Sequence, residues 1–310
     1  MRPTHIILGI LLAIIWGCNF IAIQLSLTEI PPFLLCAIRF FFASVPIIFF
    51  IKRPAIPLYM LTAYGLLTFG IQFTLLFVGM NLGMPPGLSS LILQMQLFFS
   101  LLLAIIFTNE RPNRVQIIGM CVAFGCIAVV ISQLDHTASI FAFSCVLLAA
   151  LSWGAGNIIT KKFTKVNAIA LVTWGSFVAC LPLAILSLLI DGPSAIINSI
   201  KHLSLLVVSS TAYIVYLSTW VGYGLWNWLL KKYNIATVVP FGLLVPVFGM
   251  LSSTLIFNEE IQLWKLTAAC LILLGVSIHL FGAHFSLFLT RAFEPLVRRF
   301  NINISTRSNT

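Results

Sequence analysis

Long apolar segments dominate the chain, and short polar turns separate them. Ten segments have the roughly 20 apolar residues that are needed to cross a bilayer core of about 30 Å. These predicted spans cover residues 6–26, 33–51, 58–79, 85–107, 115–133, 139–160, 168–190, 204–229, 235–257 and 264–283. Little of the chain remains outside them, so the pattern predicts an all-α integral membrane protein with ten transmembrane helices.

The second half of the chain repeats the pattern of the first. The segment that ends at Glu110 aligns with the segment that ends at Glu260, a spacing of 150 residues. Near the start of each half Trp16 recurs as Trp153, a spacing of 137, which indicates that residues were added around 191–202. Because each half holds an odd number of spans, the second copy is reversed in the membrane. We therefore expect two inverted five-helix repeats with a substrate site where they meet.

This pattern divides the chain into three parts: a first repeat at 1–134, a second, inverted repeat at 135–283 and a tail at 284–310. In the tail, apolar residues at helical spacing alternate with Arg291, Arg298 and Arg299, which suits a helix lying on an anionic inner leaflet. Pro295 would kink or interrupt that helix. A disordered basic tail is the alternative.

Composition and charge define the class of protein and its orientation. Hydrophobic residues make up 60% of the chain and charged residues only 8%, which leaves no room for a soluble catalytic or nucleic-acid-binding domain. We therefore interpret the net charge of +10 as a signal of how the chain is oriented in the membrane, and not as a binding site for a polyanion. With the N-terminus in the cytoplasm, only Lys201 and Lys265 of the 17 Lys and Arg residues lie outside and Arg39 lies within a span, so 14 lie inside. The positive-inside rule then places both termini in the cytoplasm.

Polar side chains recur at helical spacing within several spans. Four stripes result: Trp16 with Asn19, Tyr64 with Thr68 and Gln72, Trp153 with Asn157, and Tyr216 with Trp220, Tyr223 and Asn227. Since polar groups in hydrocarbon must face protein or water, these stripes are predicted to line a polar cavity. The alternative is that each amide bonds a neighbouring helix and each aromatic ring packs.

Span four adds two glutamines, and span nine adds a proline. Gln94 and Gln96 point about 200° apart on an α-helix, so we expect that only one of them faces the cavity. In the repeat alignment Gln96 falls opposite Pro246. Because proline has no backbone N–H, the carbonyl one turn earlier in the helix is left free as a hydrogen-bond acceptor, and the helix at this point could be either a hinge or a static kink.

Arg39 lies about seven residues into span two, roughly 10 Å deep at 1.5 Å per residue. It could bind the carboxylate of a small substrate or lock an outer gate, but it could also snorkel outward or cap loop carbonyls, which is the simpler expectation for a single charge. His279, a lone imidazole near the end of span ten, is expected to be a hydrogen-bonded packing residue.

The sequence offers no catalytic or cofactor chemistry. No Asp or Glu lies in the middle of a span, and no paired carboxylate, metal-ligand motif, nucleophile motif or phosphate loop is present. We therefore predict no enzyme activity, no cofactor, no metal and no nucleic-acid partner. The expected partners are a small-molecule substrate and membrane lipids.

Several motifs together resemble a known family. They are WGCNF at 16–20, IRF at 38–40, GMPPGLSSLILQMQLFF at 83–99, NERPNRVQIIG at 109–119, SWGAGNI at 152–158, VGYGLW at 221–226 and LLVPVFG at 243–249. They resemble the EamA branch of the drug/metabolite transporter superfamily over residues 5–283. Within that branch the paired glutamines are similar to those of bacterial O-acetylserine/cysteine exporters.

The resemblance implies a ten-helix bundle with a central cavity in the bacterial inner membrane. It also implies the secondary-active export of small amino-acid metabolites, cysteine-like or O-acetylserine-like, by alternating access. Export of other amino acids, aromatic metabolites or drugs is the alternative, and an intramembrane enzyme or an assembly factor is the alternative of another class. The resemblance places eight residues around the substrate: Trp16, Asn19, Gln72, Gln94, Gln96, Trp153, Asn157 and Tyr223. Arg39 matches the family's basic residue on span two, and both Arg39 and Pro246 are candidates for gating or carboxylate binding.

Overall fold

The computed structural model of the chain is helical throughout the residues that it describes. These are residues 2–108, 114–132, 139–163, 166–233, 238, 241–242, 244–275 and 277–278, and they contain no strand. In this part of the chain, seven helices are long and apolar enough to cross a membrane. The all-α membrane class is confirmed, whereas the count of ten spans and the inverted repeat stay predictions.

The helices follow the apolar segments. The first part of the chain forms α1 (Pro3–Ser26), α2 (Pro32–Ser44), α3 (Leu58–Gly65), α4 (Gln72–Asn81), α5 (Pro86–Ile92), α6 (Gln96–Thr108) and α7 (Arg114–Ile131). The second part forms α9 (Ile140–Lys162), α10 (Ala168–Leu186), α11 (Pro193–Lys201), α12 (Leu205–Ala212), α13 (Tyr223–Lys232) and α15 (Val245–Phe257), and a further apolar helix covers Leu263–Gly275.

Short stretches of other helix types interrupt these α-helices. The 3₁₀ turns are η1 (Ile47–Phe49) and η3 (Leu93–Met95), and the π-helical stretches are η2 (Leu66–Ile71), η4 (Ser187–Asp191) and η5 (Tyr213–Gly222). Three of them, η2, η3 and η5, lie in the middle of long apolar helices, where they change the direction in which the following side chains point.

Local sequence signals fix where several helices begin. The Ser139 hydroxyl accepts the Ala142 N–H at the start of α9, and the Ser204 hydroxyl accepts the Val207 N–H at the start of α12. Proline occupies the first turn of α1, α2, α5 and α11, where its missing N–H costs nothing. The predicted insertion at 191–202 is largely helix α11, which has no buried residue.

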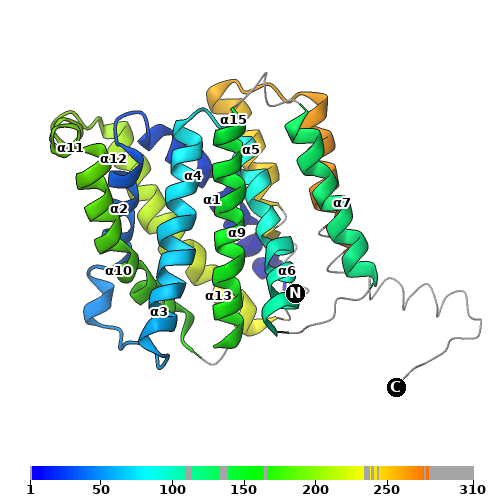
Figure 1. Cartoon of the computed structure of the whole chain (residues 1–310), viewed down its shortest axis with the longest axis horizontal. Helices are drawn as coiled ribbons and strands as arrows, with labels where there is room; N and C mark the ends of the chain where they lie inside the picture. The colour runs from blue at the N-terminus through cyan, green and yellow to red at the C-terminus, as the bar shows by residue number, and fades with distance from the viewer. Residues whose placement is uncertain are drawn as a thin grey trace, which may run out of the picture.

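Helices from the two parts of the chain interleave. Helix α10 packs against α2 and α3, α9 packs against α4 and α6, and α1 packs against α12 and α15. Figure 1 shows the long helices side by side, with α11 and α7 at opposite edges of the bundle. Large apolar side chains also cover the outside, including Leu181 and Ile106, which are 68% and 67% exposed. Such an exterior suits hydrocarbon and not water.

Small residues and acidic residues bring particular helices together. A Cβ atom at Gly17 of α1 would lie 2.5 Å from the Phe248 Cβ of α15, so only glycine permits this crossing. Asp191 accepts the Leu34 N–H at 2.9 Å, and Glu29 accepts the Ser204 N–H at 2.7 Å. Each carboxylate therefore stabilises the start of a helix in the other part of the chain. His279 and the tail at 284–310 lie outside the described residues.

Candidate functional site

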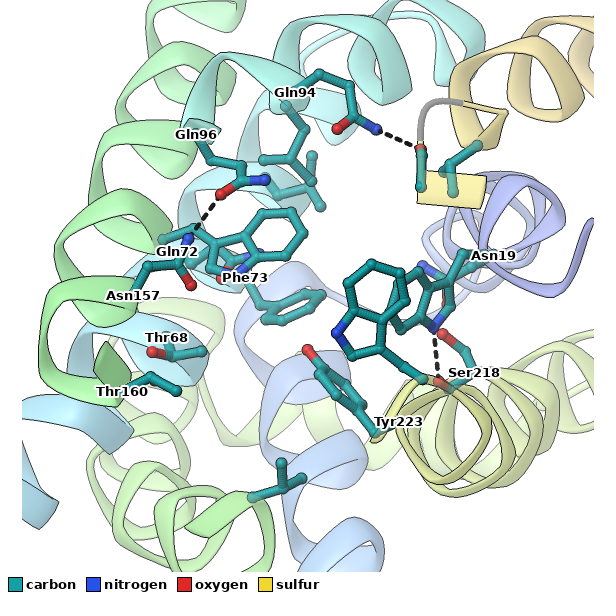
Figure 2. A pocket seen from close by; sticks show the side chains of 18 of the residues that line it. Asn19, Thr68, Gln72, Phe73, Gln94, Gln96, Asn157, Thr160, Ser218 and Tyr223 are labelled. Atoms are coloured by element: carbon teal, nitrogen blue, oxygen red, sulfur yellow. Dashed lines mark hydrogen bonds between the residues drawn. The ribbon is translucent and has the colours of Figure 1, made fainter. Parts of the chain in front are cut away.

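A cavity of about 320 Å³ lies between the interleaved helices. Its walls come from both parts of the chain, and Figure 2 shows Gln72, Gln96 and Asn157 on one side with Asn19 and Tyr223 on the other. The sequence analysis selected ten residues for substrate contact or gating, and nine of them line the cavity: Trp16, Asn19, Arg39, Gln72, Gln94, Gln96, Trp153, Asn157 and Tyr223. Pro246 does not; it is buried in the first turn of α15.

An aromatic cluster forms one wall of the cavity. The Trp16 indole N–H donates to the Ser218 carbonyl at 3.1 Å, which fixes the ring. The ring centroid of Trp16 lies 5.6 Å from that of Tyr223 and 5.5 Å from that of Trp226. A Cβ atom at Gly222 would lie 2.3 Å from the Trp16 Nε1, so this glycine makes room for the indole.

Amide side chains form the opposite wall. Asn157 Nδ2 donates to Gln96 Oε1 at 2.7 Å and to the Ser100 hydroxyl at 3.0 Å, which links α9 to α6. Gln94 Nε2 contacts the Gly242 carbonyl at 3.4 Å (Figure 2). These side chains use their polar groups on neighbouring helices while they line the cavity. Both interpretations of the stripes, a cavity lining and a bond to a neighbouring helix, therefore hold for Asn157.

The expectation that only one of the two glutamines faces the cavity is wrong. Gln94 and Gln96 both line it. The reason is the 3₁₀ turn η3 (Leu93–Met95), in which residues advance about 120° each and not about 100°. Two such steps separate the directions of the Gln94 and Gln96 side chains by about 120°, and this smaller angle allows both side chains to border the same cavity.

A second expectation, on the stripe from Tyr216 to Asn227, is also wrong in part. Tyr223 lines the cavity, but Tyr216 is 41% exposed and the Trp220 indole donates to the Ala43 carbonyl at 3.1 Å. The π-helix η5 (Tyr213–Gly222) turns more slowly than an α-helix and shifts the register between these positions. Ser218 and Trp226 also line the cavity. Trp226 follows Tyr223 by three residues within α13 and so shares its face, whereas Ser218 lies in η5 and α-helical spacing does not find it.

Arg39 is buried and does not snorkel. Its side chain is 2% exposed and belongs to the cavity wall. The guanidinium carbon lies 4.1 Å from the centroid of the Phe73 ring, and Nη2 contacts the Thr219 hydroxyl at 3.4 Å. No carboxylate among the described residues lines the cavity or pairs with Arg39. The expectation of outward snorkelling or loop capping is therefore wrong.

The cavity extends to one end of the bundle. Thr160, near the end of α9, and Ala168, the first residue of α10, both line it. Sequence reasoning did not select Thr160, Ser90 or Phe73 as lining residues, because single hydroxyls and apolar rings carry no signal of their own. Among the described residues no group of three or more His, Cys, Asp or Glu side chains could hold a metal ion.

A helical bundle with a lipid-compatible exterior around a cavity that has amide, hydroxyl and aromatic side chains in its wall is the architecture of a membrane transporter. The sequence profile of the EamA-like transporter family matches residues 3–132 and 140–281. The chain therefore belongs to the EamA-like transporter family.

Relatives with assigned names are transporters too. A "probable amino-acid metabolite efflux pump" of Escherichia coli (strain K12) is 37% identical over 283 residues, which cover 89% of this chain and 94% of that protein. A protein of the same name from Salmonella typhimurium has the same identity and coverage. A "probable terminal-alkyne amino-acid exporter" of Streptantibioticus cattleyicolor is 25% identical over 198 residues, 63% of this chain and 64% of that protein.

A solved crystal structure has a similar fold. It superimposes with a TM-score of 0.60 at 17% sequence identity and covers 90% of this chain and 99% of that chain. At this level of identity the likeness concerns the fold alone.

Proposed function

We propose that the protein is a secondary-active exporter of small amino-acid metabolites, such as cysteine or O-acetylserine, across the bacterial inner membrane by alternating access. The observation that carries this proposal is the cavity of about 320 Å³ with amide and aromatic walls inside a lipid-facing bundle. Its size lies at the small end of ligand sites. The names of the E. coli and Salmonella relatives support the substrate class.

The proposal includes two inverted five-helix repeats, at 1–134 and 135–283, followed by a cytoplasmic tail. The internal sequence repeat supports this division, and so do the two family matches at 3–132 and 140–281. Rocking of one set of helices against the other would open the cavity first to one side and then to the other.

The end of the cavity that Thr160 and Ala168 border is proposed to face the cytoplasm. The loop between α9 and α10 follows Lys161 and Lys162 and contains Lys165, so the positive-inside rule assigns it to that side. With both termini also cytoplasmic, the described arrangement would load a substrate from inside the cell, as an exporter requires.

The proposed substrate contacts are the eight residues selected from the sequence, with Arg39 as a further contact and Pro246 in gating. Amide groups and aromatic faces can replace the hydration shell of a small polar solute without holding it too tightly for release. All eight line the cavity: Trp16, Asn19, Gln72, Gln94, Gln96, Trp153, Asn157 and Tyr223.

Efflux from cells tests the proposal. Cells that produce the protein are expected to release cysteine and O-acetylserine several-fold faster than cells that carry the empty vector, and Gln72→Leu is expected to reduce this release. Gln24→Leu is the matched control, since Gln24 lies on α1 outside the cavity lining. Equal release from producing and control cells, with the protein shown in the membrane, removes these substrates. A parallel panel of other amino acids, aromatic metabolites and drugs examines the alternative cargoes.

A further inference from the structure

Buried polar atoms without partners gather at the cavity. Among the described residues, nine buried side-chain N and O atoms have no hydrogen-bond partner, and five of them belong to cavity-lining residues. Arg39 contributes two donors, Nε and Nη1, whereas Asn19 Oδ1 and Gln72 Oε1 are acceptors and Thr68 Oγ1 can act either way. A buried polar group without a partner destabilises the protein, so an accumulation of them in one cavity requires an explanation.

The unpartnered donors carry a full positive charge. Arg39 rests on the Phe73 ring and contacts the Thr219 hydroxyl through Nη2, and both of these partners are neutral. The other amino-acid side chains of the cavity wall carry no negative charge. A guanidinium that is shielded from water and lacks a counter-ion is costly in hydrocarbon, and its planar N–H groups match a carboxylate.

The unpartnered acceptors are amide oxygens, which carry a partial negative charge, in contrast to the positively charged donors of Arg39. Gln72 is the residue next to Phe73, on which the guanidinium lies, and Asn19 stands one turn from Trp16 on α1. Figure 2 shows Gln72 and Asn19 on opposite sides of the cavity. Amide oxygens accept hydrogen bonds from an ammonium group, and the nearby faces of Trp16 and Tyr223 also attract a cation.

We infer that the cavity recognises an α-amino acid as a zwitterion, with its carboxylate on Arg39 and its ammonium on the amide oxygen of Gln72. This inference rests on the proposed function and assigns each charge of the substrate to named atoms. The polar atoms of Arg39 and Gln72 that have no partner are buried in this structure, so the side chains that cover them must move aside when the substrate binds. An amine without a carboxylate would instead place a second positive charge beside Arg39, with no described carboxylate to offset it.

Two matched sets of three compounds test the inference. Each set has the zwitterion, the acid without the amine, and the amine without the acid: L-cysteine, 3-mercaptopropanoate and cysteamine, and O-acetyl-L-serine, 3-acetoxypropanoate and 2-aminoethyl acetate. Binding to the purified full-length protein in lipid nanodiscs is measured by calorimetry at neutral pH, under reducing conditions for the thiols. We expect the zwitterion of at least one set to bind best, and the matching amine to bind about 10- to 100-fold more weakly, the range for a lost charge-assisted hydrogen bond.

Variants assign each charge to its residue. Arg39→Gln is expected to weaken the zwitterion and the acid but not the amine, and Arg39→Lys, which keeps the charge, is expected to give an intermediate loss. Gln72→Leu should weaken the zwitterion and the amine but not the acid. Gln24→Leu and Arg53→Gln, which lie outside the cavity lining, should leave every affinity unchanged. Size-exclusion chromatography and circular dichroism establish that each variant is folded.

Several results would overturn the inference: an amine that binds as tightly as its zwitterion, an unchanged affinity in Arg39→Gln, or no binding of any of the six compounds to folded protein. If efflux occurs while this binding order fails, the exporter proposal stands and the inference falls. If the order holds without efflux, the inference stands and the exporter proposal falls.

Discussion

Asn157 Nδ2 donates a hydrogen bond of 2.7 Å to Gln96 Oε1 and joins the two parts of the chain across the cavity wall. The same Asn157 amide also reaches the Ser100 hydroxyl at 3.0 Å, and that hydroxyl donates to the Gln96 carbonyl of its own helix. Three polar side chains thus form one network between α9 and α6. A network of this kind can hold the two helices in register while its amides still border the cavity.

This network should contribute a measurable coupling energy. In a double-mutant cycle with Asn157→Ala and Gln96→Ala, the free energies of unfolding should be non-additive by about 0.6 to 1.7 kcal/mol, the range measured for polar pairs between membrane helices. Unfolding in mixed detergent micelles with increasing dodecyl sulfate provides the measurement. Asn157→Ala combined with Gln24→Ala serves as the uncoupled control pair. Additive effects in both cycles would show that the hydrogen bond contributes nothing to stability.

The close approach of α1 and α15 should make Gly17 intolerant of any side chain. In Gly17→Ala the new Cβ would lie 2.5 Å from the Phe248 Cβ and 2.9 Å from the Gly249 amide nitrogen, so the two helices must separate. We expect a loss of about 1 to 3 kcal/mol, the usual cost of overpacking. Gly224→Ala is the matched control because, apart from its chain neighbours and the backbone of its own helix, no atom lies within 4 Å of its new Cβ. A lower unfolding temperature for Gly224→Ala than for Gly17→Ala would contradict this packing.

The ion pair between Lys265 and Glu259 should be costly to break from one side. The Lys265 Nζ lies 3.0 Å from Glu259 Oε1 and 2.8 Å from the Glu260 carbonyl, and the Ser253 hydroxyl also donates to Glu259. The two charged side chains are only 6% and 14% exposed. Lys265→Met alone should lower the free energy of unfolding by about 3 kcal/mol, because it leaves a buried carboxylate unpaired.

Removal of both charges provides the control for that prediction. The double variant Lys265→Met with Glu259→Gln should recover most of the loss, since replacement of both partners of a buried pair is often nearly neutral. Thermal unfolding in the same detergent compares the three proteins. A single variant as stable as the parent would mean that water reaches this pair and screens it.

Regular helices explain why part of the cavity could be predicted from the sequence. Trp16 and Asn19 lie three residues apart within α1, and Trp153 and Asn157 lie four apart within α9. Both helices are α-helical at these positions, so the spacing alone shows which face the side chains share. Hydropathy likewise located the apolar helices, because their length is set by the bilayer and not by details of packing.

Other parts of the cavity could not be predicted because the helices depart from α geometry. The 3₁₀ turn η3 separates Gln94 from Gln96, and the π-helix η5 shifts Trp220 away from the cavity. The amino-acid sequence carries no clear signal for such local 3₁₀ or π-helical stretches, because they depend on how neighbouring helices pack. The burial of Arg39 was also unpredictable, since it depends on Phe73, a residue of α4 that is distant in sequence.

The orientation in the membrane can be tested with single cysteines in a variant that lacks the seven natural ones. His202 and Lys52 are both exposed but are predicted on opposite sides, His202 outside and Lys52 in the cytoplasm. In intact spheroplasts, a membrane-impermeant maleimide should label His202→Cys fully and leave Lys52→Cys unlabelled, whereas lysis should expose both. The contrast follows from charge, because 14 of the 17 Lys and Arg residues fall on one side in this orientation. The reverse labelling pattern would place the end of the cavity that Thr160 and Ala168 line on the outer side, and the proposal that this end receives substrate from the cytoplasm would then fall.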